Sequence, residues 1–382
     1  MNKITKIFFL SVLSSVLCSC ASFFDKDNTP QPAPLVQFTP EIPVHALWTI
    51  RPSSGVGKDY IKLIPAVTAA DIFTADKNGT VSAIDKQTHK IRWRVNAGAA
   101  LSAGPTAAEG LVIVGSKEGD IIALQQTNGQ LAWKTTASSE IFAAPAVGNG
   151  VVLVKSIDGK LSAFAAADGH PLWHYQQTEP TLILHGASVP QISHDIVIAG
   201  FANGNLAKLT LDSGNLLWQN TLATPEGSFA IQRMIDIDAD PIIMGDRVYA
   251  ATYQGHLAAL DLNSGQTLWV HDLSSYTGMV VDGDRIYVTD AKSDVWAFDK
   301  RNGTVIWRQI QLEARNLTAP VLMGNTIVVG DGEGYLHWLS KEDGRTLARV
   351  KVNKSGILAA PVVSDGLLYV VTKDGHVAAY AY

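Results

Sequence analysis

The segment "DIDAD" (residues 236–240) has the alternating carboxylates with which a calcium-binding EF-hand loop begins. Such a loop also needs glycine at its sixth position and a bidentate glutamate at its twelfth. This chain has Pro241 and Arg247 at those two positions. The spacing therefore predicts no calcium site, and the aspartates need another role.

Two other patterns have residue types that could do chemistry. The segment "SSGVGKD" (53–59) is similar to a phosphate-binding loop, but Asp59 stands where that loop needs a serine or threonine. His170 and His174 are four residues apart, but a turn leading into a strand separates them, so the metal-binding spacing of a helix does not apply. The sequence thus predicts no metal site, no cofactor and no catalytic residues.

The two cysteines of the chain, Cys18 and Cys20, both lie near its start. They follow the apolar run 7–17, which is itself preceded by two lysines. Because this run is too short to cross a bilayer as a helix, it predicts an export signal. The segment "LCSC" (17–20) resembles a bacterial lipoprotein processing site, which implies lipidation at Cys20. An ordinary secretory signal is the alternative.

This interpretation divides the start of the chain into two parts. Residues 1–19 are the predicted signal peptide, and residues 20–43 are the lipidated N-terminus with a proline-rich, extended tether. By the same resemblance, Ala21 after the cysteine favours sorting to the outer membrane. The formal net charge is −5 and no cluster of Lys and Arg interrupts it, which argues against nucleic acid as a partner.

A repeat organises the rest of the chain. Four short runs rich in β-branched and aromatic residues alternate with Gly, Asn or Asp turns, which predicts a four-stranded antiparallel meander. A proline precedes a tryptophan by 28 residues in five copies, and Met279 takes the proline position in a sixth. The tryptophans of these copies are Trp93, Trp133, Trp173, Trp218, Trp269 and Trp307.

Meanders of about forty residues that stack side by side are typical of a β-propeller. The last unit supplies only three strands, and the missing outer strand is predicted at 45–51, around Trp48. We therefore predict an all-β, eight-bladed β-propeller over residues 44–382, with the N-terminal strand closing the last blade. Each tryptophan is expected to pack against the next blade. Alanines recur on the third strand, replaced by Lys208 and Trp338 in two copies.

Two consecutive connections between repeats are unusually long, and both belong to the type that joins an outer strand to the next inner strand. They are residues 178–188 and 223–240. The first has Leu182, Ile183 and Leu184 in a row; the second has several apolar residues beside two aspartates. Adjacent apolar loops with a few charges predict a protein-binding surface. The alternative is that they fold back over their own blades.

The tryptophan repeat resembles that of quinoprotein alcohol dehydrogenases, which hold pyrroloquinoline quinone and calcium, so an enzyme of that kind is one alternative. The absence of cysteine after Cys20 removes the vicinal disulfide of those enzymes. The leader, "DLNSGQTLW" (261–269), "GDGEGYLHWLSKEDGR" (330–345) and "RMIDIDADP" (233–241) more closely resemble the BamB family. That resemblance implies a non-catalytic scaffold lipoprotein of the barrel-assembly machinery, on the periplasmic face of the outer membrane.

The resemblance also implies partners and site residues. In that family two loops bind the periplasmic POTRA domains of BamA, and other barrel-assembly subunits are reached indirectly. The partner-binding positions fall on Leu182, Ile183, Leu184, His185, Asp236 and Asp238. His185 stands where the family has arginine, which replaces a permanent charge by one that depends on pH. General binding of unfolded outer-membrane proteins is the other alternative.

Overall fold

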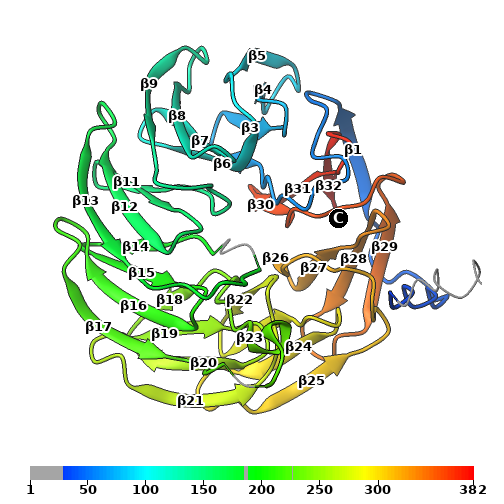
Figure 1. Cartoon of the computed structure of the whole chain (residues 1–382). Coiled ribbons are helices and arrows are strands. Elements are labelled where there is room, and N and C mark those ends of the chain that lie inside the picture. Colours follow the sequence, from blue (N-terminus) through cyan, green and yellow to red (C-terminus); the bar gives the residue numbers. More distant parts are fainter. Residues whose placement is uncertain (1–28, 185–187, 226) are drawn as a thin grey trace, which may run out of the picture. The chain divides into compact units, whose positions relative to one another are not determined.

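The computed structural model describes residues 29–184, 188–225 and 227–382. By its contacts the chain divides into two units, Met1–Pro32 and Ala33–Tyr382. The second unit contains eight four-stranded antiparallel sheets. Figure 1 shows these sheets as blades that follow one another around a ring in chain order. The predicted eight-bladed propeller is confirmed.

The strands of each blade run from the innermost to the outermost. Blade one contains β2 (Ala66–Val67), β3 (Asp71–Ala75), β4 (Thr80–Asp85) and β5 (Ile91–Asn96). Blade two contains β6 (Leu101–Ala108), β7 (Leu111–Ser116), β8 (Asp120–Gln125) and β9 (Leu131–Thr136). Blade three contains β10 (Ala146–Gly148), β11 (Val151–Lys155), β12 (Lys160–Ala165) and β13 (Pro171–Gln176). Blade four contains β14 (Gln191–Ser193), β15 (Ile196–Gly200), β16 (Asn205–Thr210) and β17 (Leu216–Thr221).

The second half of the ring repeats this order after the short 3-10 helix η1 (Ala230–Arg233). Blade five contains β18 (Ile242–Met244), β19 (Arg247–Ala251), β20 (His256–Asp261) and β21 (Thr267–Asp272). Blade six contains β22 (Gly278–Asp282), β23 (Arg285–Thr289), β24 (Val295–Asp299) and β25 (Val305–Gln309). Blade seven contains β26 (Val321–Met323), β27 (Thr326–Gly330), β28 (Tyr335–Ser340) and β29 (Thr346–Lys351). Blade eight contains β30 (Val362–Ser364), β31 (Leu367–Val371), β32 (Val377–Ala381) and β1 (His45–Ile50).

The two ends of the propeller meet in blade eight. Strand β1 pairs antiparallel with β32, with Trp48 opposite Ala379, so the N-terminal segment supplies the outer strand that the last repeat lacks. The Trp48 ring stacks on the imidazole of His89 in blade one, with centroids 4.9 Å apart. This pairing closes the ring as the sequence predicts.

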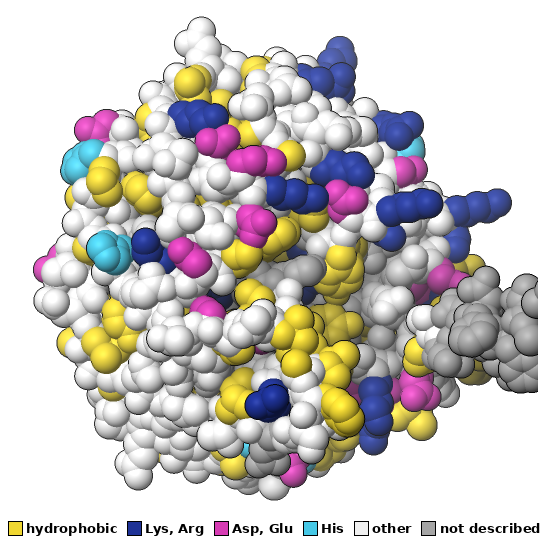
Figure 2. All heavy atoms as spheres, in the orientation of Figure 1, with side chains coloured by type: hydrophobic (Ala, Val, Ile, Leu, Met, Phe, Trp, Pro, Cys, Tyr) yellow, Lys and Arg dark blue, Asp and Glu magenta, His cyan; other side chains and the backbone are white. Residues whose placement is uncertain are grey.

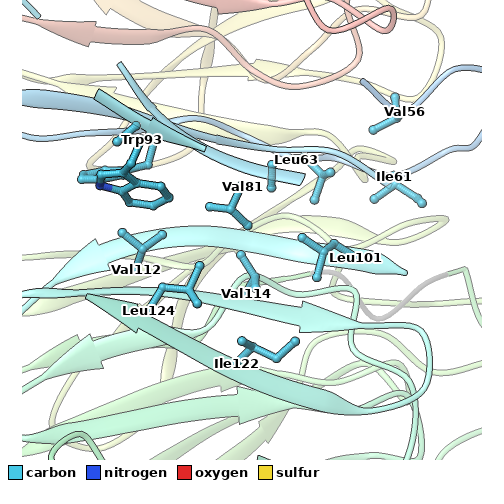
Figure 3. Close-up of a cluster of buried hydrophobic side chains, with 13 residues drawn as sticks. Val56, Ile61, Leu63, Val81, Trp93, Leu101, Val112, Val114, Ile122 and Leu124 are labelled. Atoms are coloured by element: carbon cyan, nitrogen blue, oxygen red, sulfur yellow. The ribbon is translucent and has the colours of Figure 1, made fainter. Parts of the chain in front are cut away.

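The tryptophans of the repeat connect neighbouring blades. The indole N–H of Trp93 donates to the carbonyl of Gln126 in blade two at 2.8 Å, and five further tryptophans donate in the same way. The Trp93 ring covers Gly129 so closely that a Cβ there would lie 2.6 Å from a ring carbon. In Figure 3 the ring lies beside Val112 of the next blade. The predicted packing of each tryptophan against the next blade is confirmed.

Blade seven exchanges the two residues of one cross-strand pair. In blade one Ala83 faces Trp93 across β4 and β5, whereas in blade seven Trp338 on β28 faces Ala348 on β29. Both Trp338 and Ala348 are buried. Because one large and one small side chain fill the space in either order, the exchange keeps the volume between the strands nearly unchanged.

The proline-rich segment predicted as a tether is not free along its whole length. From residue 33 to residue 43 it is extended, as its composition predicts, but it lies against blade seven. The backbone N–H of Glu41 donates to the carbonyl of Leu347 at 2.8 Å, and the Glu41 carboxylate pairs with Arg345 at 2.9 Å. The N–H of Ala33 donates to the carbonyl of Glu313. The outer strand β29 thus carries an extended segment of the same chain on its edge.

The order of strands in a blade decides which connections share a face of the ring. In an antiparallel meander, the turn between the second and third strands lies at the same end as the connection that leaves the fourth strand. The long segments 177–190 and 222–241, the segment 51–65 and the short turn at 252–255 therefore all emerge on one face. The tryptophan contacts lie toward the opposite face, at the turns between third and fourth strands.

Candidate functional site

The long connections of the shared face come together around one pocket. Its walls contain Tyr60 from 51–65, Leu184 from 177–190 and Met234 from 222–241. Apolar side chains gather near the middle of the face drawn in Figure 2. Two of these connections were predicted to be neighbours; the third, 51–65, reaches the same pocket through Tyr60.

Part of the predicted apolar surface is exposed. Leu182 is 44% exposed, and Ile183 and Leu184 are half-buried. In the second connection Phe229 is 69% exposed and Ile231 is 61% exposed, at the start of η1. Large apolar side chains that remain in contact with water on adjacent loops are typical of a protein-binding surface.

The two aspartates are not surface charges, which corrects the expectation from the sequence. Asp236 is completely buried and Asp238 is 7% exposed. The neighbouring Met234, Ile235 and Ile237 are buried as well. Residues 234–239 therefore follow the alternative prediction, in which the loop folds back over its own blades; here these are blades four and five.

The buried carboxylates hold the first loop in place. Oδ2 of Asp236 accepts a hydrogen bond from the backbone N–H of Leu184. Oδ1 of Asp240 accepts one from the N–H of Val189 at 2.7 Å. The two loops are thus one structural unit, in which the second connection supplies acceptors for the backbone of the first at Leu184 and at Val189. Hydrogen bonds from backbone N–H to a charged acceptor are among the stronger ones in proteins.

A network of buried charges lies beneath the loops. Burial, together with the nearby carboxylate of Asp238, raises the pKa of Asp236 to about 7. Burial also raises the pKa of Glu179 and of Asp240. A buried carboxylate is costly unless a cation or hydrogen bonds accompany it, so the cations close to this network are needed to balance it.

Two lysines provide that balance. The Nζ of Lys155 donates to Oγ of Ser188 at 2.6 Å and to the carbonyl of Gly200 at 2.8 Å. The Nζ of Lys62 donates to the carbonyl of Tyr276 at 3.0 Å. Burial lowers the pKa of both lysines, while the surrounding aspartates oppose this shift. Among the described residues of this network, four carboxyl groups accompany two ammonium groups, so the lysines provide part of the balance.

The structure thus brings together Leu184, Asp236 and Asp238 of the predicted site, with Leu182 and Ile183 on the same loop. His185 lies outside the described residues. The residues that the sequence did not indicate are Tyr60, Lys62, Lys155, Asp240, Tyr253 and Tyr276. The length of 51–65 was a signal for Tyr60, whereas Tyr253 lies in a turn of ordinary length and carries no local signal.

The described ranges contain no group of three or more His, Cys, Asp or Glu that could hold a metal ion. Nor does any helix in them have the length and apolar composition needed to span a membrane. The geometry of this face, with exposed apolar loops held from below by buried polar contacts, is suited to binding another macromolecule.

Comparison with known proteins relates this geometry to a family. The model of the family "Outer membrane protein assembly factor BamB" matches residues 77–309 and 309–381. The outer membrane protein assembly factor BamB of Legionella pneumophila (strain Paris) is 43% identical over 355 residues, which cover 92% of this chain and 91% of the relative.

Solved structures agree with this relationship. The crystal structure of BamB from Moraxella catarrhalis superposes with a TM-score of 0.82 at 26% identity and covers 89% of this chain and 100% of that chain. A quinohemoprotein alcohol dehydrogenase of Pseudomonas putida HK5 has a TM-score of 0.72 at 14% identity, covering 88% of this chain and 76% of that chain, which shows a common fold alone. The chain therefore belongs to the family of the outer membrane protein assembly factor BamB.

Proposed function

We propose that this chain is a non-catalytic scaffold lipoprotein of the outer-membrane β-barrel assembly complex. Its two loops bind the periplasmic POTRA domains of BamA and so support insertion of outer-membrane proteins. The observation that carries the proposal is the pair of adjacent loops whose exposed apolar side chains are held by buried hydrogen bonds. A surface ordered before binding loses less conformational entropy when the partner arrives.

The predicted site residues have two different roles in this proposal. Leu182, Ile183 and Leu184 contact the partner, and His185 adds a polar contact beside them. Asp236 acts from below by positioning the loop, since it is buried and accepts a hydrogen bond from the Leu184 N–H. Asp238 is 7% exposed and lies in the wall of the pocket beside the loops. Other subunits of the complex are reached through BamA.

The start of the chain is proposed to place the propeller at the membrane. Residues 1–19 are removed as a signal peptide, Cys20 is lipidated, and the tether from residue 20 to residue 43 connects the lipid to the propeller on the periplasmic face. Within this tether, residues 33–43 lie against the propeller.

A second candidate function has one observation in its favour. The outer strands present apolar side chains to water: Leu131 is 61% exposed, Leu217 50% and Val270 53%. Because an outer strand also has one edge outside the sheet, it is suited to pairing with an extended apolar segment such as an unfolded barrel strand. Crosslinking of such segments to the outer strands in preference to the loops would favour this function.

The test compares two double variants. Leu182→Ala with Leu184→Ala should weaken binding of a purified POTRA fragment of BamA by roughly 2–4 kcal/mol, the range of interface hot spots. The control is Leu217→Ala with Leu268→Ala, since these leucines of outer strands are 50% and 46% exposed. Biolayer interferometry gives the affinities, and thermal melts establish that both variants fold.

The outcomes separate the proposal from its alternatives. Equal affinity of the loop variant and the wild type would place the interface elsewhere. Weaker binding by the control variant alone would favour the outer strands. For the enzyme alternative, purified protein incubated with calcium and pyrroloquinoline quinone is expected to retain no quinone and to oxidise no alcohol; stoichiometric retention would favour a quinoprotein dehydrogenase instead.

A further inference from the structure

A pocket of about 440 Å³ opens beside the two loops, and three tyrosines dominate its walls. Tyr60 comes from the connection between β1 and β2, Tyr253 from the turn between β19 and β20, and Tyr276 from the connection between β21 and β22. The rings of Tyr253 and Tyr276 are 5.9 Å apart and nearly perpendicular. Three different parts of the ring thus present aromatic groups to one space.

The remaining wall combines apolar groups with one carboxylate. Ile183, Leu184 and Met234 contribute aliphatic and thioether surface, and Asp238 contributes the charge. A side chain that fits this wall needs an apolar stem and a polar, cationic end. Long basic side chains have this construction, because their methylene groups pack on apolar surface while the charged group stays near polar partners.

The surroundings favour a positive charge in the pocket. Among the described residues, four acidic side chains lie near the lysines Lys62 and Lys155, and both lysines already donate to neighbouring oxygens. Within the described part of the chain, Oδ1 of Asp236 is buried and accepts no hydrogen bond. A cation entering the pocket would therefore meet carboxyl oxygens that can accept its hydrogen bonds, with Asp238 in the pocket wall itself.

One of the tyrosine rings already lies near a cation. The Nζ of Lys62 lies 5.8 Å from the centroid of the Tyr276 ring. Tyrosine faces attract cations through the ring quadrupole, and the attraction is stronger where water is excluded. The arrangement shows that these rings tolerate positive charge at cation–π distance.

On the basis of the protein-binding function proposed above, we propose that this pocket receives an arginine side chain of the protein partner. Arginine fits better than lysine for two reasons. Its planar guanidinium stacks on tyrosine rings, and its five N–H donors can reach a carboxylate while the stack is kept. The methylene groups of the arginine pack on Leu184 and Met234, so the pocket recognises both the shape and the charge of this side chain.

The direct test uses a small probe on the whole protein. Nα-acetyl-arginine amide is titrated into protein with labelled methyl groups, and the methyl resonances of Ile183, Leu184 and Met234 are followed. We expect saturable shifts of these three residues with a dissociation constant on the order of millimolar. The matched control is Nα-acetyl-citrulline amide, which has the same shape without the charge and should cause no saturable shift. Equal shifts with both probes, or none with either, would overturn the proposal.

Variants of Tyr253 and Asp238 measure what the aromatic ring and the carboxylate each contribute to binding of the probe. Tyr253→Ala should weaken the probe's binding about tenfold, whereas Tyr253→Phe keeps the ring and should stay within about twofold of the wild type. Asp238→Asn removes the charge and should also weaken binding. An unchanged methyl spectrum without the probe checks that each variant folds. Equal binding by Tyr253→Ala and wild type would contradict the aromatic role.

The POTRA fragment distinguishes failure of this inference from failure of the proposed function. If the loop leucines are needed for capture but Tyr253→Ala captures the fragment normally, the interface stands and the arginine pocket is wrong. If the leucines are not needed, the proposed function fails, and the probe titration still decides whether the pocket binds a guanidinium. Millimolar acetyl-arginine amide should reduce capture of the fragment by the wild type and not by Tyr253→Ala.

Discussion

Replacement of Asp236 by Asn should make the stability of the propeller less dependent on pH. Asp236 is completely buried, and its pKa is raised to about 7 by burial and by the adjacent Asp238. Asparagine keeps an oxygen that can accept the hydrogen bond from Leu184 N–H, but it never carries the charge. The variant therefore removes the cost of a buried carboxylate while the contact between the loops remains.

The sign and size of the effect follow from the two pKa values. Below 3.8, the ordinary value, the carboxyl is protonated in both the folded and unfolded protein, so ionisation costs nothing there. Between 3.8 and about 7 the unfolded chain ionises first, so the folded state loses stability as pH rises. Above about 7 the full cost is present, up to about 4 kcal/mol for a difference of this size.

Thermal melts from about pH 4 to about pH 8 give the measurement. The Asp236→Asn variant should melt close to the wild type at the acidic end and several degrees higher at the basic end, since 1 kcal/mol corresponds to roughly 2 °C in a chain of this size. A melting difference that stays constant across this range would refute the argument that Asp236 carries a buried, destabilising charge.

Asp374, whose pKa is lowered where that of Asp236 is raised, provides the control. Burial alone would raise the pKa of Asp374, but hydrogen bonds from Thr372, Asn353 and Ser355 hold that pKa well below its usual range. A lowered pKa contributes stability that is present above 3.8 and is lost as pH falls. Asp374→Asn should therefore lower the melting temperature at neutral pH, with a difference that narrows in acid.

Two further predictions concern the scaffold and the anchor. Trp133→Ala should cost roughly 3–5 kcal/mol, because it leaves a void between blades two and three and an unpaired carbonyl at Ala166. Gly169→Ala should also lower the melting temperature, since its Cβ would lie 2.5 Å from a carbon of the Trp133 ring; melts that match the wild type would contradict both. Cys20→Ala should release the protein into the soluble periplasm, whereas Cys18→Ala should leave it in the membrane fraction. Equal membrane recovery of the two cysteine variants would exclude lipidation at Cys20.

The repeats were sufficient to predict the architecture. Turn glycines and β-branched runs recur along the chain and act over distances of a few residues. A proline, or Met279 in one copy, precedes six of the tryptophans by 28 residues. The last repeat has only three strands and Trp48 lies outside the repeats, which predicted that the first strand completes the last blade; the pairing of β1 with β32 confirms this. Repetition made these predictions reliable, because the same local pattern had to be satisfied many times.

The position of the long loops could also be predicted, because their extra residues all fall in one type of connection. The exposure of Leu182, Phe229 and Ile231 agrees with the apolar surface expected there. The expected surface position was wrong for the two aspartates of the second loop, which are buried. Asp236 and Asp238 look like solvent charges in the sequence, since an alternating run of aspartates has no local reason to be buried.

The role of those aspartates is apparent only in the folded chain. Asp236 is buried because Leu184, from the preceding connection, supplies the N–H that its carboxylate accepts, and Lys155, from β11, supplies part of the balancing charge. In the same way Tyr60, Tyr253 and Tyr276 become one pocket only when the ring closes and brings blades one, five and six around a common space. Burial of a charge and convergence of side chains depend on partners that are distant in the sequence, and no local pattern contains that information.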